Sequence, residues 1–185
     1  MASRAGDKGG WLKAEQHVAA NEPTRVRRMK YLAPYLSKPA DVLEVGCSSG
    51  FMLYPLAAAG HRCTGVEPSG VFSEFVNERG LTAYQSLDQL RQNAPDARFD
   101  LILHFFVLEH IANPATFLAE LLLLLKPGGK IVFEIPNAAD PLYSVYDIPA
   151  FERFYWSVAH PWYFSESSLH FLLKQLGHSY EVLRD

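Results

Sequence analysis

The sequence predicts an α/β protein with a doubly wound, mostly parallel sheet that carries helices on both faces. Short apolar segments rich in β-branched residues alternate with helical segments from residue 41 onward, which is the pattern of βαβ units with right-handed crossovers. A glycine-bounded turn, Gly46 to Gly50, directly follows the first of these strands. The chain has 185 residues, of which 49% are hydrophobic, and this is enough for one domain with a substantial core.

Residues 1–40 are expected to form a disordered lead and two helices ahead of the sheet. The first ten residues are polar and rich in glycine, and helical spacing then covers residues 11–22 and 24–36, with Pro34 bending or ending the second helix. This part carries eight Lys/Arg against three Asp/Glu, whereas the rest of the chain carries nine against seventeen. The contrast fits either a basic helix that docks on an acidic body or a basic gate over an anionic substrate.

Residues 41–185 are expected to form the main domain. The predicted strands are residues 41–45, 62–67, 82–85, 99–106, 130–136 and 179–183. The predicted helices are residues 51–60, 69–80, 86–94, 113–129 and 165–177. Their boundaries rest on the candidate N-caps Ser69, Asn113 and Ser165 and on the stop signals Gly60 and Gly80.

The turn at Gly46–Gly50 lies where a parallel α/β sheet binds its ligand, beyond the carboxyl ends of the strands. Glycine allows the turn and lets the backbone approach a ligand closely. The N–H groups at the start of the following helix favour a carboxylate or a phosphate. Glu67 ends the second strand, where an acid can accept hydrogen bonds from both hydroxyls of a ribose. The two features together predict a ligand that contains a nucleoside.

The glycine spacing disfavours two common nucleotide-binding motifs. The dinucleotide fingerprint is G-x-G-x-x-G, whereas three residues, Cys47, Ser48 and Ser49, separate the glycines here, and no third glycine follows at the required place. The Walker A pattern is absent because no Gly-Lys-Ser/Thr follows. A nicotinamide-dependent oxidoreductase is therefore the weaker alternative.

Four segments resemble the class I S-adenosylmethionine-dependent methyltransferases in order and spacing: VLEVGCSSGF, GVEPS, FDLILHFFVLEHIANP and LLKPGGKIVFEIPN. The resemblance runs from about Tyr31 to the end. The later segment HPWYFSESSLHFLLKQLGH is similar to the branch that methylates small molecules, including ubiquinone-type and polysaccharide-pathway methyltransferases. The resemblance to this family implies a Rossmann-like domain over residues 41–185, with S-adenosylmethionine as the cofactor. The implied activity is methyl transfer to an oxygen or carbon of a small-molecule acceptor.

The resemblance also implies where the cofactor binds. Glu44 and the glycine turn would hold the methionine end, and Glu67 would hold the ribose. The end of the second strand and the start of the 86–94 helix would contact the adenine, and the end of the fourth strand would line the methionine. The implied cofactor-binding residues are Glu44, Gly46, Cys47, Ser48, Gly50, Glu67, Pro68, Ser86, Leu87, His104, Phe105 and Phe106.

His110 and His160 are the candidate catalytic residues. His110 follows Glu109 just after the fourth strand, and a histidine there can act as a base near neutral pH. Alternatively, the Glu109–His110 pair only fixes the local helical turn, and His160 is only a satisfied loop histidine. A metal is not expected, because Phe106 occupies the position at which some ubiquinone-type relatives have a further acid that completes a metal-like cluster.

Other residues have candidate roles as well. The aromatic residues Tyr143, Tyr146, Phe154, Tyr155 and Trp156 either build an acceptor pocket or pack as a small core. Arg27 and Tyr31 precede the sheet and are expected to cover the carboxylate of the cofactor. Cys47 is expected to be a small packing residue rather than a nucleophile.

Composition restricts the partners and the compartment. The formal net charge is −3, which argues against nucleic-acid binding by charge alone. The two cysteines are too few for a disulfide framework, and neither a signal peptide nor a membrane span is recognised, so a cytoplasmic protein without a membrane span is expected. Domains of this class end with a hairpin of sixth and seventh strands, whereas residues 179–185 supply at most the sixth. The first alternative is a non-catalytic cofactor-binding domain of a larger protein. A methyltransferase that acts on protein or nucleic acid is a further alternative, but the Asn/Asp-Pro-Pro-aromatic set of the amino-methylating DNA and RNA enzymes is absent after the fourth strand.

Overall fold

The computed structural model describes residues 10–140 and 159–183. The chain divides into two compact units, one made of residues 1–105 and 124–133 and the other of residues 106–123 and 134–185. The N-terminal helices belong to the same unit as the sheet. The predicted domain boundary after residue 40 stays a prediction, and most of the predicted disordered lead lies outside the described residues.

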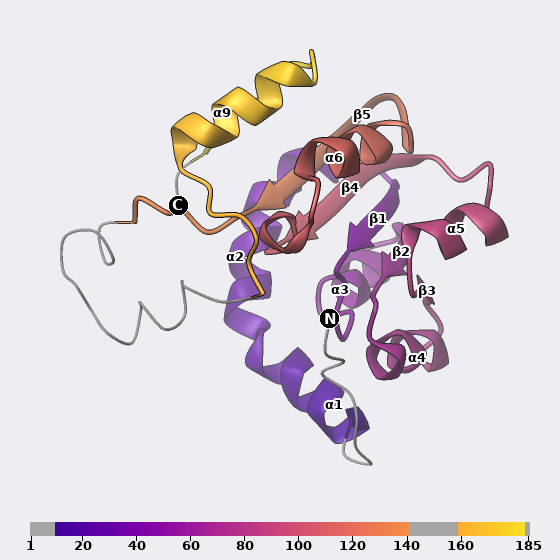
Figure 1. The fold of residues 1–185 in the computed structure, drawn as a ribbon. Helices are drawn as coiled ribbons and strands as arrows, with labels where there is room; N and C mark the ends of the chain where they lie inside the picture. Colours follow the sequence, from indigo (N-terminus) through magenta and orange to yellow (C-terminus); the bar gives the residue numbers. More distant parts are fainter. Residues whose placement is uncertain (1–9, 141–158, 184–185) are drawn as a thin grey trace. The chain divides into compact units, whose positions relative to one another are not determined.

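The first unit is built on a parallel sheet with the strand order β3-β2-β1-β4-β5 (Figure 1). Val45 at the end of β1 lies opposite Val66 of β2 and His104 of β4. The order of the strands reverses between β1 and β4, so the switch point, where α/β sheets bind ligands, lies at the carboxyl ends of these two strands. The strands are β1 Asp41–Val45, β2 Arg62–Val66, β3 Thr82–Tyr84, β4 Phe99–Phe105 and β5 Leu125–Glu134.

Both faces of the central strands are buried. Neighbouring residues of a strand point to opposite faces. Val42 and Leu43 of β1 are both fully buried, and Leu101 and Ile102 of β4 are at most 1% exposed. Val42 and Leu101 belong to one hydrophobic cluster. It also contains Leu32 of α2, Leu56 of α3 (Leu53–Ala58) and Met52, which directly precedes α3. Burial on both faces explains why these strands are continuously apolar in sequence, and it confirms the predicted fold class.

Two helices precede the sheet, as predicted. They are α1 (Gly10–Ala20) and α2 (Glu22–Leu32), followed by the 3₁₀ turn Ala33–Tyr35. Pro34 lies inside that turn, so the α-helix ends just before the proline, which lacks an N–H and hinders the preceding turn. Ala14 of α1 packs with Phe72 and Phe75 of the helix after β2.

The local boundary signals of the next helices are confirmed. The helices are α3 Leu53–Ala58, α4 Gly70–Glu78 and α5 Leu87–Asn93. The Ser69 side chain accepts a hydrogen bond from the Phe72 N–H at 3.4 Å. Gly60 and Gly80 follow their helices with φ of 94° and 83°, a left-handed conformation that glycine adopts without a Cβ penalty.

In the second unit, the helix predicted over residues 113–129 is shorter than expected. It is α6 (Pro114–Leu122), and the Asn113 side chain caps it by accepting a hydrogen bond from the Thr116 N–H at 3.2 Å. The chain after this helix does not continue the helical turns that the leucine-rich sequence favours. The predicted end at Gly129 is therefore wrong.

The reason for the early end is pairing with β4 in the first unit. The Phe99 N–H donates to the Leu124 carbonyl at 2.9 Å. A Cβ added to Gly129 would lie 2.9 Å from the Phe99 carbonyl oxygen, so the backbone of this segment runs against β4. Because these contacts outweigh helical propensity, β5 begins at Leu125 instead of the predicted Lys130.

The predicted strand over residues 179–183 does not form. The other helix of the second unit, α9 (Glu166–Gln175), is closed at its start by a capping box between Ser165 and Ser168, as the Ser165 prediction required. Tyr180 packs back onto this helix, with its hydroxyl 3.1 Å from His170 Nδ1 and the two rings 5.4 Å apart. The segment is thus engaged by a helix rather than by a neighbouring strand.

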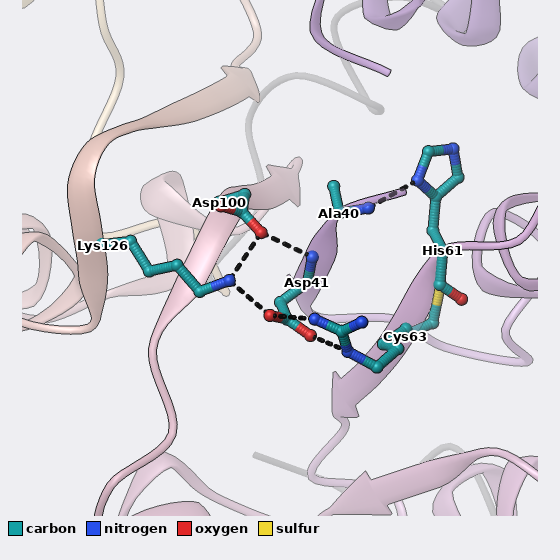
Figure 2. A network of polar contacts seen from close by, with 7 residues as sticks. Ala40, Asp41, His61, Cys63, Asp100 and Lys126 are labelled. Carbon is teal, nitrogen blue, oxygen red and sulfur yellow. Dashed lines mark hydrogen bonds and ion pairs between the residues drawn. The ribbon is translucent and has the colours of Figure 1, made fainter. Parts of the chain in front are cut away.

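A polar network joins the amino-terminal ends of four strands, β1, β2, β4 and β5 (Figure 2). The Asp41 N–H donates to Asp100 Oδ2 at 2.8 Å. Lys126 Nζ donates to Asp100 Oδ2 at 2.7 Å and also to the Asp41 carboxylate. Arg62 Nη2 donates to Asp41 Oδ2 at 2.7 Å. The hydrogen bond from Arg62 is the main cause that lowers the pKa of Asp41, and the hydrogen bond from Lys126 is the main cause that lowers the pKa of Asp100. The network lies at the end of the sheet opposite the switch point.

We expect Lys126→Gln to lower the thermal unfolding temperature at neutral pH, because it leaves two carboxylates without their shared cation. Carboxyl groups whose pKa is lowered in the folded state stabilise it above their ordinary pKa, near 3.8, and this contribution disappears as the pH falls through the lowered values. The difference between variant and wild type should therefore shrink as the pH falls below about 4. Melting curves between pH 3 and pH 7 would measure it. Lys130→Gln, at an exposed position of the same strand, is the matched control, and an equal effect of both substitutions would contradict the role of the network.

Candidate functional site

The turn after β1 has the geometry that its glycines predict. Gly46, Ser48 and Gly50 have positive φ values of 78°, 49° and 76°. The N–H groups of Gly46 and Cys47 donate to the Val66 carbonyl at 2.7 and 3.2 Å, which fastens the turn to the end of β2. Ser48 adopts a left-handed conformation that is uncommon for residues other than glycine, and such strain concentrates at functional sites.

The structure gives Gly50 and Cys47 packing roles. A Cβ added to Gly50 would lie 3.0 Å from Val76 Cγ2 and 3.1 Å from the Tyr54 ring, so the glycine is required by packing as well as by φ. The Cys47 side chain is fully buried, and a Cβ on Gly65 would lie only 2.5 Å from its sulfur. Burial raises the pKa of this thiol well above its usual value. Cys47 therefore belongs to the core, as predicted, and only its backbone is available to the turn.

Glu67 holds the turn from the side of β2. Its Oε2 accepts a hydrogen bond from the Ser48 N–H at 2.9 Å, and its Oε1 accepts one from the Ser69 N–H at 2.8 Å. An ionised carboxylate offers about four acceptor sites, so a side chain that accepts backbone bonds can also accept from the hydroxyls of a ribose. Glu67 thus fixes the strained Ser48 and remains suited to its predicted partner.

Glu44 is a buried acid at the same edge of the sheet. Its side chain is 2% exposed, and its Oε2 has no hydrogen-bond partner among the residues that the structure describes. Burial raises the pKa of this carboxyl to about 8, while the positive charge of Arg28 acts in the opposite direction. A buried polar atom without a partner costs stability. In a native protein it requires an explanation, and a ligand atom at this position would provide one.

Arg28 is the residue that sequence reasoning missed. Arg27 and Tyr31 were the predicted contacts of the cofactor carboxylate, but Tyr31 is 38% exposed and Arg27 is only half-buried, whereas Arg28 is 4% exposed. The Arg28 guanidinium carbon lies 4.0 Å from the ring centroid of Phe105, at the end of β4. The i, i+4 spacing of Arg28 and the buried Leu32 is the sequence signal that could have identified it.

A second contact that the sequence did not reveal comes from α1. His17 Nδ1 lies 2.9 Å from the hydroxyl oxygen of Ser49, which is fully buried within the turn. The His17 ring also packs edge-on against Phe51, with centroids 5.6 Å apart. The N-terminal helix therefore helps to hold the turn in place.

The predicted adenine contacts lie at the ends of β2 and β3. Pro68 is exposed, and Ser86 and Leu87 are half-buried. Ser86 is the N-cap of α5, and its side chain accepts a hydrogen bond from the Gln89 N–H at 3.1 Å. Its hydroxyl can still donate a hydrogen bond, so contact with an adenine edge stays a prediction.

The end of β4 holds the three residues predicted to line the methionine. His104 is fully buried and stacks on Phe133, with ring centroids 4.5 Å apart. Burial lowers the pKa of His104 to about 3, so its imidazole is neutral. Phe105 lies against Arg28, and Phe106, the first residue of the second unit, has a φ of 55° and is 44% exposed. The structure thus gives His104 a packing role, and its predicted contact with the cofactor stays untested.

The two candidate catalytic histidines come together in the second unit. Their rings lie edge to face with centroids 4.5 Å apart. His110 Nδ1 is 2.9 Å from the Ala159 carbonyl oxygen, and the Trp162 Nε1–H donates to the Ala112 carbonyl at 3.3 Å. These bonds join the segment around His160 to the 3₁₀ turn Leu108–His110.

Glu109 completes a cluster with the two histidines. One ligand atom of each of Glu109, His110 and His160 lies within 4.8 Å of the others. Glu109 is 2% exposed, its Oε2 has no hydrogen-bond partner in the part of the chain that the structure describes, and burial raises the pKa of its carboxyl. The expectation that no metal binds relied on Phe106 in place of an acid, and it did not foresee that His160 would join the pair.

Two further expectations have a limited outcome. The aromatic residues proposed for an acceptor pocket, Tyr143, Tyr146, Phe154, Tyr155 and Trp156, lie outside the described residues. In the described ranges, none of the helices has the length and apolar character needed to cross a lipid bilayer.

Comparison with known proteins agrees with this geometry. The model of the methyltransferase domain family matches residues 16–181. The ubiquinone biosynthesis O-methyltransferase of Maricaulis maris is 31% identical over 115 residues, which cover 56% of this chain and 43% of that protein. The tRNA U34 carboxymethyltransferase of Hydrogenovibrio crunogenus is 35% identical over 127 residues, which cover 60% of this chain and 38% of that protein. The matched region therefore covers less than half the length of each of these two curated relatives.

Solved structures share the fold. A SAM-dependent methyltransferase from Archaeoglobus fulgidus superposes with a TM-score of 0.62 and 25% identity, over 85% of this chain and 68% of that chain. A plantazolicin methyltransferase solved in complex with SAH superposes with a TM-score of 0.67, over 91% of this chain and 72% of that chain, and its 18% identity supports the fold alone. With the family model matching nearly the whole chain and the glycine turn, Glu44 and Glu67 at the switch point of the sheet, this chain belongs to the class I S-adenosylmethionine-dependent methyltransferases.

Proposed function

We propose that this chain binds S-adenosylmethionine at the carboxyl ends of β1, β2 and β4 and transfers its methyl group to an oxygen or carbon of a small-molecule acceptor. The observation that carries the proposal is the buried acid Glu44, whose Oε2 has no hydrogen-bond partner among the described residues and on which the charge of the buried Arg28 acts, at the end of the sheet where this fold binds ligands. Within the proposal, residues 41–185 form the cofactor-binding domain, as the sequence predicted.

The residues at this edge fit an amino acid joined to a nucleoside. The Glu44 oxygen that has no partner among the described residues would accept a hydrogen bond from the cofactor's amino group, and Arg28 would bind its carboxylate. Glu67 would bind the ribose hydroxyls through its carboxylate, which offers about four acceptor sites. The Glu44 oxygen and the Arg28 guanidinium thus match the ammonium and carboxylate ends of a zwitterion. When bound, S-adenosylmethionine supplies a methyl group on a sulfonium centre, which is already a good leaving group.

The protein's own contribution is mainly orientation. Aligning the two reactants and excluding water can supply a large part of the rate enhancement. A base is needed only where the acceptor is a hydroxyl or an acidic carbon. We propose that His110 and His160 serve the acceptor: because the Ala159 carbonyl accepts from His110 Nδ1, Nε2 of the neutral ring keeps the lone pair that can take a proton.

The acceptor class is inferred from the relatives and from the charge of the chain. The ubiquinone-pathway relatives are named for O-methylation of a small molecule, whereas one relative is named for a tRNA modification. We favour a small molecule because the net charge of −3 gives nucleic acid no general electrostatic attraction. The alternative is a cofactor-binding domain without catalysis, which would bind S-adenosylhomocysteine but turn over neither small molecules nor tRNA.

We expect S-adenosylhomocysteine, but not NAD, to raise the thermal unfolding temperature of the protein. Glu67→Gln should weaken the binding of S-adenosylhomocysteine about tenfold or more, because a hydrogen bond between a charged carboxylate and a hydroxyl is lost. Isothermal titration calorimetry would measure the affinity. Glu78→Gln, at an exposed position in α4, is the control. Stabilisation by NAD, or an unchanged affinity in Glu67→Gln, would contradict the proposed site.

Glu44→Gln should bind S-adenosylhomocysteine more weakly and yet be the more stable protein without ligand. Because the folded-state pKa of Glu44 is about 8, above its unfolded value, the folded wild type loses stability as the pH rises from about 4.5 to about 8. The gain in unfolding temperature of Glu44→Gln should therefore be greater at pH 8 than at pH 5. An equal gain at both pH values, with unchanged affinity, would argue against a buried ligand-binding carboxyl.

We expect His110→Asn and His160→Asn to lower the rate of methyl transfer at least tenfold for an acceptor whose reacting group must lose a proton, with little change in S-adenosylhomocysteine affinity. The assay would follow S-adenosylhomocysteine release over a panel of hydroxylated small molecules and tRNA. His178→Asn, at an exposed position, is the control. A loss of cofactor affinity equal to the loss of rate would indicate a structural role for the histidines.

A further inference from the structure

We propose that Glu109, His110 and His160 bind a divalent transition-metal ion. The three side chains offer one carboxylate oxygen and two imidazole nitrogens, all within 4.8 Å of one another. Imidazole and carboxylate together suit zinc, manganese and iron. Ligand atoms about 2.0–2.2 Å from one ion lie about 3–4 Å apart, so the cluster has to contract by up to about 1.8 Å to surround an ion.

Glu109 is the first reason to favour an ion over a chance cluster. Its side chain is 2% exposed and its Oε2 has no hydrogen-bond partner among the described residues, although His110 is its neighbour in the chain. Burying a carboxylate in this way is costly unless a positive charge compensates it. A bound cation would provide that charge.

The orientation of His110 is the second reason. Its Nδ1 lies 2.9 Å from the Ala159 carbonyl oxygen, which can only accept, so Nδ1 carries the hydrogen. This leaves the Nε2 lone pair available for an ion. Metal-binding histidines commonly donate their other ring N–H to a backbone carbonyl or a carboxylate in this way, and the bond fixes the tautomer and the ring orientation.

His160 is held in place by its own segment. The Trp162 Nε1–H donates to the Ala112 carbonyl at 3.3 Å, and the Ala138 N–H donates to the Phe164 carbonyl at 2.8 Å. The ring of His160 meets His110 edge to face at 4.5 Å and Tyr163 at 5.9 Å. The third ligand therefore packs against His110 and Tyr163, next to residues that are hydrogen-bonded within the second unit.

The use of the ion, though not its binding, rests on the proposed methyl transfer. Three protein ligands leave coordination positions open, and a hydroxyl bound to such an ion has a lowered pKa. With the ion present, His110 and His160 act as ligands, and the charge of the ion promotes proton loss from an oxygen acceptor.

The test is metal titration of the whole chain after treatment with a chelator and buffer exchange. We expect Zn²⁺ to bind with a stoichiometry near one and micromolar or tighter affinity by isothermal titration calorimetry, and Mg²⁺ to bind far more weakly. His160→Gln and Glu109→Gln should each weaken the affinity for Zn²⁺ at least tenfold, whereas His178→Gln should leave it unchanged. Circular dichroism and S-adenosylhomocysteine affinity would show that each variant folds.

Two results would overturn the inference: no uptake of Zn²⁺ by the wild type, or uptake that His160→Gln and Glu109→Gln leave unchanged. The failure of the proposed function is a separate observation. If Zn²⁺ binds as expected while S-adenosylhomocysteine does not bind, the metal site stands and the methyltransferase proposal falls. If S-adenosylhomocysteine binds and Zn²⁺ does not, the metal site falls and the proposed cofactor site stands.

Discussion

The parallel pairing of β1 with β2 and β4 is the constraint on which the first unit depends. Because the strands run in one direction and are buried on both faces, polar groups that serve a ligand are concentrated where the strands end. Glu44 precedes the last residue of β1, Glu67 directly follows β2, and Phe105 ends β4. The register that places Val45 beside Val66 and His104 therefore also decides which side chains gather at the candidate site.

Charge is used differently at the two ends of this sheet. At the amino-terminal ends, Asp41 and Asp100 are satisfied by Lys126 and by a backbone N–H, and that arrangement stabilises the fold without a ligand. At the carboxyl-terminal ends, Glu44 is buried with an oxygen that lacks a partner among the described residues. A satisfied network favours the folded state, whereas a buried acid with an unmet hydrogen bond lowers stability until a ligand arrives.

The same physical signature appears in the second unit. Glu109 is as buried as Glu44, and its carboxyl pKa is likewise raised mainly by burial. Each acid has nitrogen-bearing side chains near it: the positive charge of Arg28 acts on Glu44, and two imidazoles, which can be metal ligands, lie close to Glu109. Both acids have a buried oxygen without a hydrogen-bond partner among the described residues, and they are the positions to which we assign ligands.

The sequence by itself determined the features that depend on neighbouring residues. The first strand lies at residues 41–45 as predicted, Ser69, Asn113 and Ser165 cap their helices, and Gly60 and Gly80 end theirs. These signals work because an N-cap oxygen or a left-handed glycine acts on backbone groups within one turn of it. The glycine turn and Glu67 were also recognisable, since their roles follow from their positions at the ends of strands.

Tertiary structure decided what depends on contacts between distant segments. Pairing of Leu124 with Phe99 ends α6 early, and packing of Tyr180 on His170 replaces the predicted sixth strand. Arg28, rather than Arg27, is the buried arginine. Consecutive residues of a helix point about 100° apart, so only packing against the sheet decides which of the two faces inward. The meeting of His110 with His160 had no signal in the sequence, because the two lie in segments whose approach depends on the folding of the whole second unit.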